Sequence, residues 1–358
     1  MLIACNITKK KRDIAVAMLI YPYPTFVLNH TIAMGTGAIQ AAGYPPFTGW
    51  SRYLLSMLQI PGVFAVPTLL FISGSFVAYA AKGDPPSLTF RFISSNVKHI
   101  LWPYLIWSVV FYVLIYFHNN QSYTLLQYLK NLIVGYPFHF IPLLVFYYII
   151  SPLLVRIAKP HGLLLIILIG LYQFLLLSVM DPEILGFSLP SWTQSLTPPV
   201  IRQTMANWAI FFPLGMVYGM NAKKLSAWAV KLKWFLGLML AVFLVIAFLD
   251  SFSYLNARFA RYLVPFIFVL LIPAIKRDSI PQVRYLENIG KRTYGIYLTH
   301  LIVIDLVLWI FESTFQNIFS YPILLFPLVF ILGLQIPMVL MDIVANAPTR
   351  KMFRYVFG

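Results

Sequence analysis

The sequence is poor in acidic residues, in cysteine and in long polar segments. Of its 358 residues, 10 are Asp or Glu, and Cys5 is the one cysteine. A single cysteine excludes an internal disulfide, a CxxC redox pair and a thiolate zinc site. No spacing of His, Asp and Glu resembles a metal site, and no glycine-rich phosphate loop follows a strand. The residues therefore predict no bound metal or cofactor.

Charged residues of both signs are scarce, whereas apolar residues are abundant. The chain is 10% charged and 60% hydrophobic, while soluble domains carry about 25% charged residues. This composition indicates a polytopic membrane protein. The net charge of +16 could suggest nucleic-acid binding, but no long polar segment exists to build a soluble basic module. We therefore expect no nucleic-acid partner.

Apolar runs of spanning length recur ten times along the chain. A hydrocarbon layer about 30 Å thick needs about 20 apolar residues in a helix. We expect one all-α domain over residues 1–358 with about ten transmembrane helices. The runs cover residues 14–33, 60–80, 101–117, 139–157, 162–180, 205–220, 232–250, 259–275, 293–311 and 321–345.

The distribution of Lys and Arg predicts the orientation. Ten spans put both termini on one side, and 21 of the 26 basic residues fall in the termini and loops of that side. Cytoplasmic loops are enriched in Lys and Arg. Both termini are therefore expected in the cytoplasm, with His30 and His139 at the outer mouth. The basic residues of the outer side are Arg52, Lys130, Arg202, Arg258 and Arg261.

Four segments, in this order along the chain, carry a family resemblance. They are 64–79 (FAVPTLLFISGSFVAY), 98–109 (KHILWPYLIWSV), 139–152 (HFIPLLVFYYIISP) and 288–301 (NIGKRTYGIYLTHL). The last resembles a late Gly-(Lys/Arg)-x-(Ser/Thr)-Tyr-Gly-Ile-Tyr-Leu-x-His signature. Together the segments resemble acyltransferase family 3, membrane-bound O-acyltransferase-type proteins that modify cell-surface glycans.

This resemblance implies an activity and a location. An acyl group, in the first place acetyl, would pass from cytoplasmic acyl-CoA to a hydroxyl of an extracytoplasmic glycan or lipid-linked sugar. Acyl-CoA is then a co-substrate, and the protein is integral to a bacterial cell membrane, in contact with membrane lipids. The resemblance also carries over an essential histidine, His30.

The first helix departs from the family pattern. The family usually has an arginine ahead of this histidine with ten residues between them, where this chain has Leu19. The nearest arginine, Arg12, would lie about 27 Å from His30 on a straight helix. Arg12 is therefore not assigned as its partner, and another residue takes that role or the role is absent.

His30 also stands out on physical grounds. If 14–33 is one straight helix, His30 lies about 24 Å along it, close to the far leaflet. Ionisable groups within spans usually mark a site, although an interfacial His30 that reaches the headgroups is the alternative. Removing a proton from a sugar hydroxyl requires a base, and neutral imidazole suits that task near pH 7. We therefore predict that His30 is the general base.

Other residues are candidates for the acceptor side or for donors to the oxyanion. Ser73 could equally serve helix packing, and His300 could equally be a buried structural histidine. Arg258 and Arg261, at i, i+3 spacing, could hold an acceptor or pair with Asp250. The full set is Asn29, Ser73, His139, Tyr147, Arg258, Arg261, Tyr297 and His300.

On the cytoplasmic side, Arg91 and Lys98 precede the third span and could bind the phosphates of coenzyme A. The alternative is that both are ordinary topology anchors. Gly215 and Gly219 have the GxxxG spacing that lets two helices approach closely, which predicts packing. His118 falls at a loop edge and is expected to be solvated.

Two other classes of function remain open at this stage. A transporter or flippase for a polysaccharide or lipid-linked precursor is also compatible with many spans and few intramembrane charges. A scaffold for a polysaccharide-synthesis complex is a weaker third alternative. The sequence leaves a homo-oligomer possible.

Overall fold

A computed structural model describes residues 23–348 and 352–358, except for residues 120, 276–279 and 281. The predictions that concern Cys5, Arg12 and Leu19 lie outside the described residues. All of the candidate site residues lie within them.

The described regular structure is helical, apart from one isolated bridge between Lys82 and Ser87. This confirms the all-α class. The α-helices are α2 (Tyr23–Ala41), α3 (Gly49–Gln59), α4 (Ala65–Ala80), α5 (Phe90–Asn119), α6 (Leu125–Val134), α7 (Phe140–Met180), α8 (Arg202–Trp208), α9 (Phe211–Met220), α10 (Ala222–Ser251), α11 (Ala260–Leu271), α12 (Val283–Lys291), α13 (Thr293–Thr314), α14 (Pro322–Asn346) and α15 (Phe353–Val356). The 3-10 helices are η1 (Ile60–Phe64), η2 (Pro182–Ile184), η3 (Ser191–Leu196), η4 (Ile272–Ala274) and η6 (Gln316–Ser320).

Helices that are long and apolar enough to cross a membrane number six among the described residues: Gly49–Ala80, Phe90–His118, Phe140–Met180, Ala222–Ser251, Thr293–Thr314 and Pro322–Asn346. The membrane character is thus supported, while the count of ten stays a prediction. The difference has three sources, of which the first is that the expected span 14–33 is described only from residue 23. Two of the expected spans lie within α7, which is continuous except for non-helical backbone at His161 after Pro160. In addition, α9 and α11 are short.

The helix that carries His30 is longer at its far end than predicted. Helix α2 continues to Ala41, eight residues beyond the expected end at 33, because its further residues are apolar or small. About 16 Å of helix therefore separates His30 from Ala41. His30 therefore lies in the interior of the helix, farther from its end than the expected span predicts.

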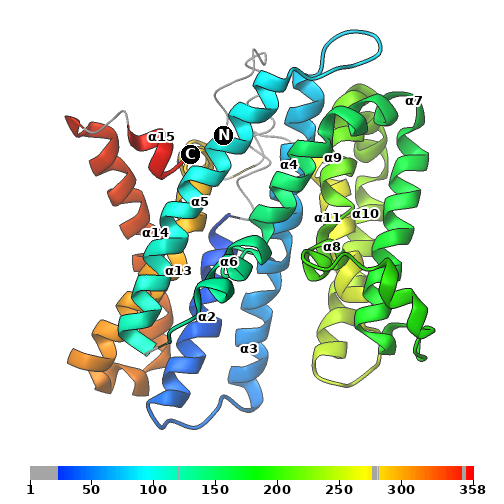
Figure 1. Ribbon diagram of the computed structural model, residues 1–358. Coiled ribbons are helices and arrows are strands. Elements are labelled where there is room, and N and C mark those ends of the chain that lie inside the picture. Colours follow the sequence, from blue (N-terminus) through cyan, green and yellow to red (C-terminus); the bar gives the residue numbers. More distant parts are fainter. Residues whose placement is uncertain (1–22, 120, 276–279, 281, 349–351) are drawn as a thin grey trace.

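The segment before α7 is also more structured than expected. Thr124 and Gln127 form a capping box that starts α6, and Gly135, at φ 90°, ends it. Figure 1 shows α6 midway along the molecule, beside the start of α7. The start of α7, where His139 is the N-cap, thus lies midway along the molecule rather than at one end.

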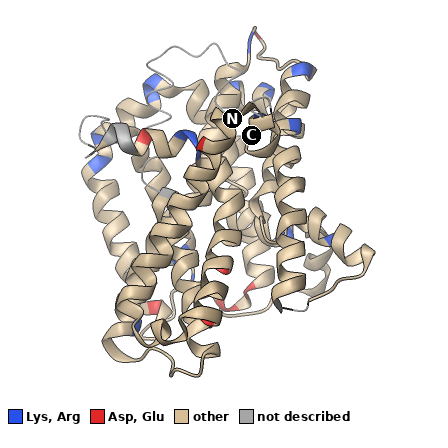
Figure 2. Ribbon diagram, turned by 90° about the vertical axis from the view of Figure 1, so that its left-hand side faces the viewer, with Lys and Arg blue, Asp and Glu red and all other residues tan. Residues whose placement is uncertain are grey.

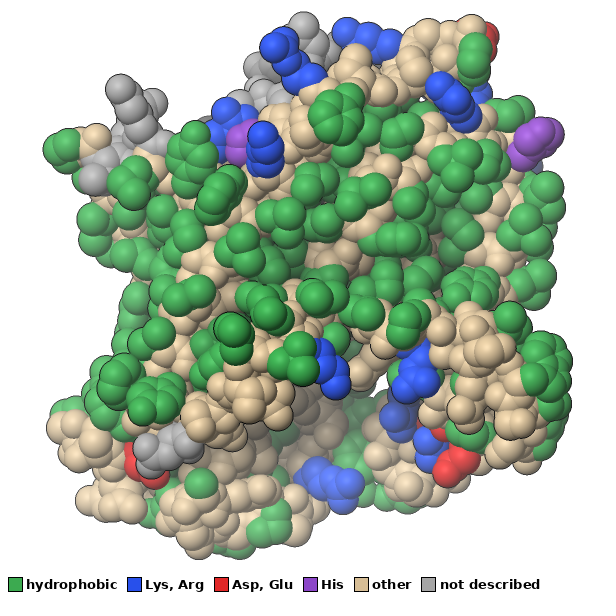
Figure 3. Space-filling view, in the orientation of Figure 1, with side chains coloured by type: hydrophobic (Ala, Val, Ile, Leu, Met, Phe, Trp, Pro, Cys, Tyr) green, Lys and Arg blue, Asp and Glu red, His purple; other side chains and the backbone are tan. Residues whose placement is uncertain are grey.

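Basic residues are concentrated at one end of the molecule. Figure 2 shows most Lys and Arg at the end where α4 stops, α5 begins and α7 kinks, which we call the basic end. Hydrophobic side chains cover the middle of the face in Figure 3, between this end and the opposite one. The arrangement agrees with the biased charge count and with an apolar belt facing lipid.

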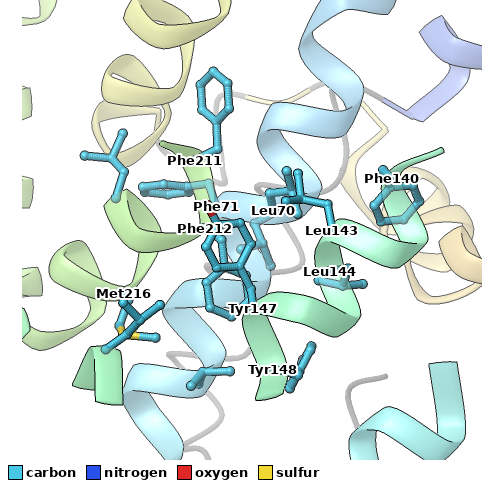
Figure 4. Close-up of a cluster of buried hydrophobic side chains, with 14 of the residues drawn as sticks. Leu70, Phe71, Phe140, Leu143, Leu144, Tyr147, Tyr148, Phe211, Phe212 and Met216 are labelled. Atoms are coloured by element: carbon cyan, nitrogen blue, oxygen red, sulfur yellow. The ribbon is translucent and has the colours of Figure 1, made fainter. Parts of the chain in front are cut away.

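The tightest packing joins α4 and α9. A Cβ added to Gly215 would lie 1.8 Å from the carbonyl oxygen of Phe71, and one added to Gly74 would lie 1.9 Å from that of Phe212. The Ser75 hydroxyl donates to the carbonyl oxygens of Phe71 and Gly215, each at 2.9 Å. The core around this crossing contains the residues of Figure 4. The packing role predicted from the GxxxG spacing is confirmed.

Candidate active site

Two histidines from distant parts of the sequence meet inside the helix bundle. His30 projects from α2 and His300 from α13, and these helices pack together. Their ring centroids lie 5.2 Å apart, with the ring planes tilted by 52°. The described residues include no hydrogen-bond partner for the His30 ring, which is half-buried. His30 is thus held by ring packing and keeps both nitrogens available.

The second histidine is fully buried but only half satisfied. The Nδ1 atom of His300 lies 3.0 Å from the Ile296 carbonyl oxygen. Because a carbonyl only accepts, Nδ1 carries the hydrogen, and Nε2 of the neutral ring is an acceptor. This Nε2 has no partner in the structure. It can accept a hydrogen from a bound hydroxyl or from a ring N–H of His30.

Aromatic rings enclose this pair. The Phe26 ring meets that of His300 edge-on at 4.7 Å, and the Tyr297 ring lies 5.9 Å from it. Tyr297 in turn contacts Phe138 and Phe140, on either side of His139 at the start of α7. Apolar rings around the pair strengthen its polar interactions with a reacting group.

A small cavity extends from this enclosure toward the basic end. Its volume is about 70 Å³, and its lining includes Ser73 of α4, Phe140 of α7, Tyr297 of α13 and Lys291, the last residue of α12. Along the chain, Lys291 precedes Tyr297 by six residues. The cavity thus connects a ring that touches His300 with a basic residue.

Comparison with known protein families matches residues 27–342 to the acyltransferase family 3 description, "Acyltransferase domain". The chain belongs to this family. No curated protein and no solved structure was found to match it. Both histidines lie within the matched residues. The histidine pair is therefore a feature of a membrane acyltransferase.

In this family 3 acyltransferase, two more predicted residues lie next to the site. The Ser73 hydroxyl donates to the Leu69 carbonyl at 2.7 Å while its residue lines the cavity. Asn29 instead packs against η1, where a Cβ added to Gly62 would lie 2.7 Å from the Asn29 Cβ. Ser73 can face a donor in the cavity, whereas Asn29 fixes α2 against η1.

Two further candidates are engaged in packing. The Tyr147 ring stacks on Phe212 at 4.9 Å, and its hydroxyl donates to the Ala209 carbonyl at 2.5 Å (Figure 4). His139 Nδ1 donates to the Pro137 carbonyl at 3.1 Å. The side chain of Tyr147 therefore packs on α9, and Nδ1 of His139 is bonded to the backbone of its own segment.

The outer arginines form ion pairs. Arg261 lies 2.8 Å from Asp250, as one of the two alternatives predicted, and Arg258 pairs with Asp181 at 3.0 Å and with Glu183. The hydrogen bond to Asp181 raises the pKa of the Arg258 guanidinium, which therefore stays charged. The Arg258 pairs connect the end of α7 to the α10–α11 turn, and the Arg261 pair joins α11 to α10.

The two predicted donor anchors, Arg91 and Lys98, do not line the cavity. Arg91 lies in the first turn of α5 and Lys98 two turns later, and both side chains are exposed near the basic end. Lys291, which is the Lys/Arg position of the late signature but not one of the predicted donor anchors, is the basic residue that lines the cavity.

One prediction about a histidine is wrong. His118 Nδ1 lies 2.9 Å from an Asp305 carboxylate oxygen, and both side chains are only 18% exposed. His118 is therefore paired rather than solvated. The two residues lie 187 positions apart, so no local signal in the sequence links them. Elsewhere among the described residues, no three His, Cys, Asp or Glu side chains are grouped to hold a metal ion.

Proposed function

We propose that this protein transfers an acyl group, in the first place acetyl, from cytoplasmic acyl-CoA to a hydroxyl of an extracytoplasmic glycan or lipid-linked sugar. The observation that carries the proposal is the contact between His30 and His300, whose Nε2 has no partner, in an aromatic enclosure with a cavity running from it toward the basic end.

His30 acts as the general base. It takes the proton of the acceptor hydroxyl as the oxygen attacks the thioester carbonyl, the C–O bond forms, and the C–S bond breaks. The proton then passes to the departing sulfur of coenzyme A, so that the histidine is regenerated. His300 Nε2 accepts a hydrogen bond from the His30 ring or from the hydroxyl, which orients the pair.

The donor enters from the basic end. Coenzyme A carries several phosphate charges, for which Arg91, Lys98 and Lys291 are suitable partners. The cavity has a volume of about 70 Å³. This small size supports a short acyl group such as acetyl, with the rest of the donor outside the cavity.

The orientation follows from the charge bias. We infer ten spans, with both termini and the basic end in the cytoplasm of a bacterial cell and the opposite end facing outward. The support is the concentration of Lys and Arg at one end (Figure 2). Membrane lipids surround the helices, and a homo-oligomer is compatible with this arrangement.

The direct test uses purified protein in lipid nanodiscs with radiolabelled acetyl-CoA and a lipid extract as acceptor source. We expect release of free coenzyme A together with label in the glycan or glycolipid fraction. A transporter or flippase, the alternative class, would release no coenzyme A, and that result would refute the proposal.

The donor anchors are tested by replacing Arg91 and Lys98 together with Gln. If both contact coenzyme A phosphates, donor affinity falls about tenfold or more while turnover at saturating donor changes little, and added salt reproduces the loss. A matched control is Lys223→Gln with Lys224→Gln, an equal loss of charge at the start of α10. Unchanged donor affinity in the Arg91 and Lys98 variant would make them topology anchors only.

A further inference from the structure

A cleft lies at the end of the molecule opposite the basic end, where α2, α5 and α13 finish. Its volume is about 700 Å³, and α13 packs on both α2 and α5 there. The lining comprises Met34, Gly37, Ala38 and Ala41 of α2, His118 of α5, and Asp305, Leu308, Trp309, Glu312 and Ser313 of α13.

The α2 wall of this cleft is continuous with the face that carries His30. Positions 30, 34, 37 and 41 follow helical spacing and share one side of α2. Met34 lies one turn beyond His30, about 6 Å along the axis. The lining of the cleft on α2 therefore ends at Met34, one helical turn from His30.

Gly37 leaves this wall open. A Cβ added at Gly37 would meet no atom within 4 Å, whereas one at Gly35 would lie 2.8 Å from the Phe326 ring. Packing thus accounts for Gly35 but not for Gly37. The missing side chain at Gly37 leaves space in the wall of the cleft.

The opposite wall is polar and aromatic. The paired His118 and Asp305 lie beside Trp309, whose ring is 5.9 Å from that of His118. Trp309 is 46% exposed, and Glu312 adds a second carboxylate. The lining contains no Lys or Arg. These carboxylates disfavour a phosphate or carboxylate ligand by repulsion, and a lipid chain would desolvate them without compensation.

We propose that this cleft binds a neutral sugar ring of the acceptor. A sugar ring has apolar C–H faces that suit the Trp309 ring, and hydroxyl edges that donate to Asp305 and Glu312 and contact His118. The open wall at Gly37 admits the ring, and one hydroxyl points along α2 toward His30. The direction of the hydroxyl toward His30 rests on the proposed function, whereas the binding of a sugar ring in the cleft does not.

The test measures binding of methyl glycosides of glucose, galactose and N-acetylglucosamine to the full chain in nanodiscs, by saturation-transfer NMR. Affinities of about 1 mM are within reach of this measurement. We expect binding of at least one glycoside, and a loss of about tenfold or more in Gly37→Leu, which fills the wall, and in Trp309→Ala, which removes the ring. Retained acetyl-CoA binding and an unchanged thermal unfolding midpoint verify that each variant is folded.

The matched control is Gly237→Leu, because Gly237 of α10 is also a helical glycine with no atom within 4 Å of an added Cβ, outside the cleft lining. Its glycoside binding should equal that of the wild type. If Gly37→Leu fails to fold, Trp309→Ala decides the result.

Three results would overturn the assignment: no glycoside binds, binding persists in both cleft variants, or choline binds in place of every glycoside, which would indicate an ammonium headgroup. Sugar binding that the cleft variants abolish, without release of coenzyme A from acetyl-CoA, would support the cleft and refute the acyl transfer. If acyl transfer depends on His30 but glycoside binding is the same in both cleft variants as in the wild type, the acyl transfer is supported and the sugar site in the cleft is refuted.

Discussion

The α4–α9 crossing and the α2–α13 contact differ in whether their buried polar groups have hydrogen-bond partners. At the crossing, Gly74 and Gly215 bring two backbones together, and the Ser75 hydroxyl has two acceptors. At the α2–α13 contact, His300 Nε2 has no partner, and the buried Thr31 hydroxyl of α2 has none either. The Ser75 hydroxyl at the crossing is satisfied by this chain alone, whereas the His300 nitrogen at the α2–α13 contact has no partner in this chain.

The largest expected effect breaks the crossing. In Gly215→Ala, the added Cβ would lie 1.8 Å from a backbone oxygen that no side-chain rotation can move. The helices must separate, and we expect a loss of more than about 3 kcal/mol of stability. Size-exclusion chromatography should then show little folded protein. Gly237→Ala is the control, since it has open space and should fold normally; equal yields of the two variants would disprove the close crossing.

A smaller effect is expected at the histidine pair. His300→Ala removes a ring that is fully buried against Phe26 and His30. The lost packing exceeds the gain from removing the unpartnered nitrogen, and we expect a net destabilisation of about 2 kcal/mol. Thermal unfolding of the purified protein measures it. A midpoint equal to that of the wild type would show that the ring does not pack as described.

The smallest effects sharpen the comparison through two hydroxyls. Ser75→Ala removes a satisfied hydrogen-bond donor and should cost about 1 kcal/mol, whereas Thr31→Val keeps the shape, removes an unpartnered hydroxyl and should be neutral or slightly stabilising. Thermal unfolding compares the two. A clear destabilisation by Thr31→Val would mean that its hydroxyl is bonded in the folded protein.

Most of the fold could be predicted because hydropathy is a local property. Nine of the expected apolar runs lie mainly on described helices, and the tenth, 14–33, is described from residue 23. Helix α6 was missed because its ten residues are too short for a span. The end of α2 was misplaced because Gly35 and Gly37 weaken the apolar signal, although packing of α2 on α13 and α14 stabilises that helical turn.

Less of the site could be predicted, because its contacts join distant segments. Motifs identified His30 and His300 separately, but their contact spans 270 positions and depends on how α2 packs on α13. Spacing alone likewise could not show that Arg258 pairs with Asp181, or that His118 pairs with Asp305. The cavity lined by Lys291 could not be predicted either, because its lining comes from distant segments of the chain.

The account depends most on His30 as the base. The decisive measurement is the rate of acyl transfer from saturating acetyl-CoA by wild type and by His30→Ala, together with the donor affinity of each. A general base contributes about 100- to 10,000-fold, so the rate should fall by that factor while coenzyme A binding stays nearly unchanged. His30→Gln should not restore the rate, because an amide cannot take the proton. Transfer at the wild-type rate by folded His30→Ala would contradict the account.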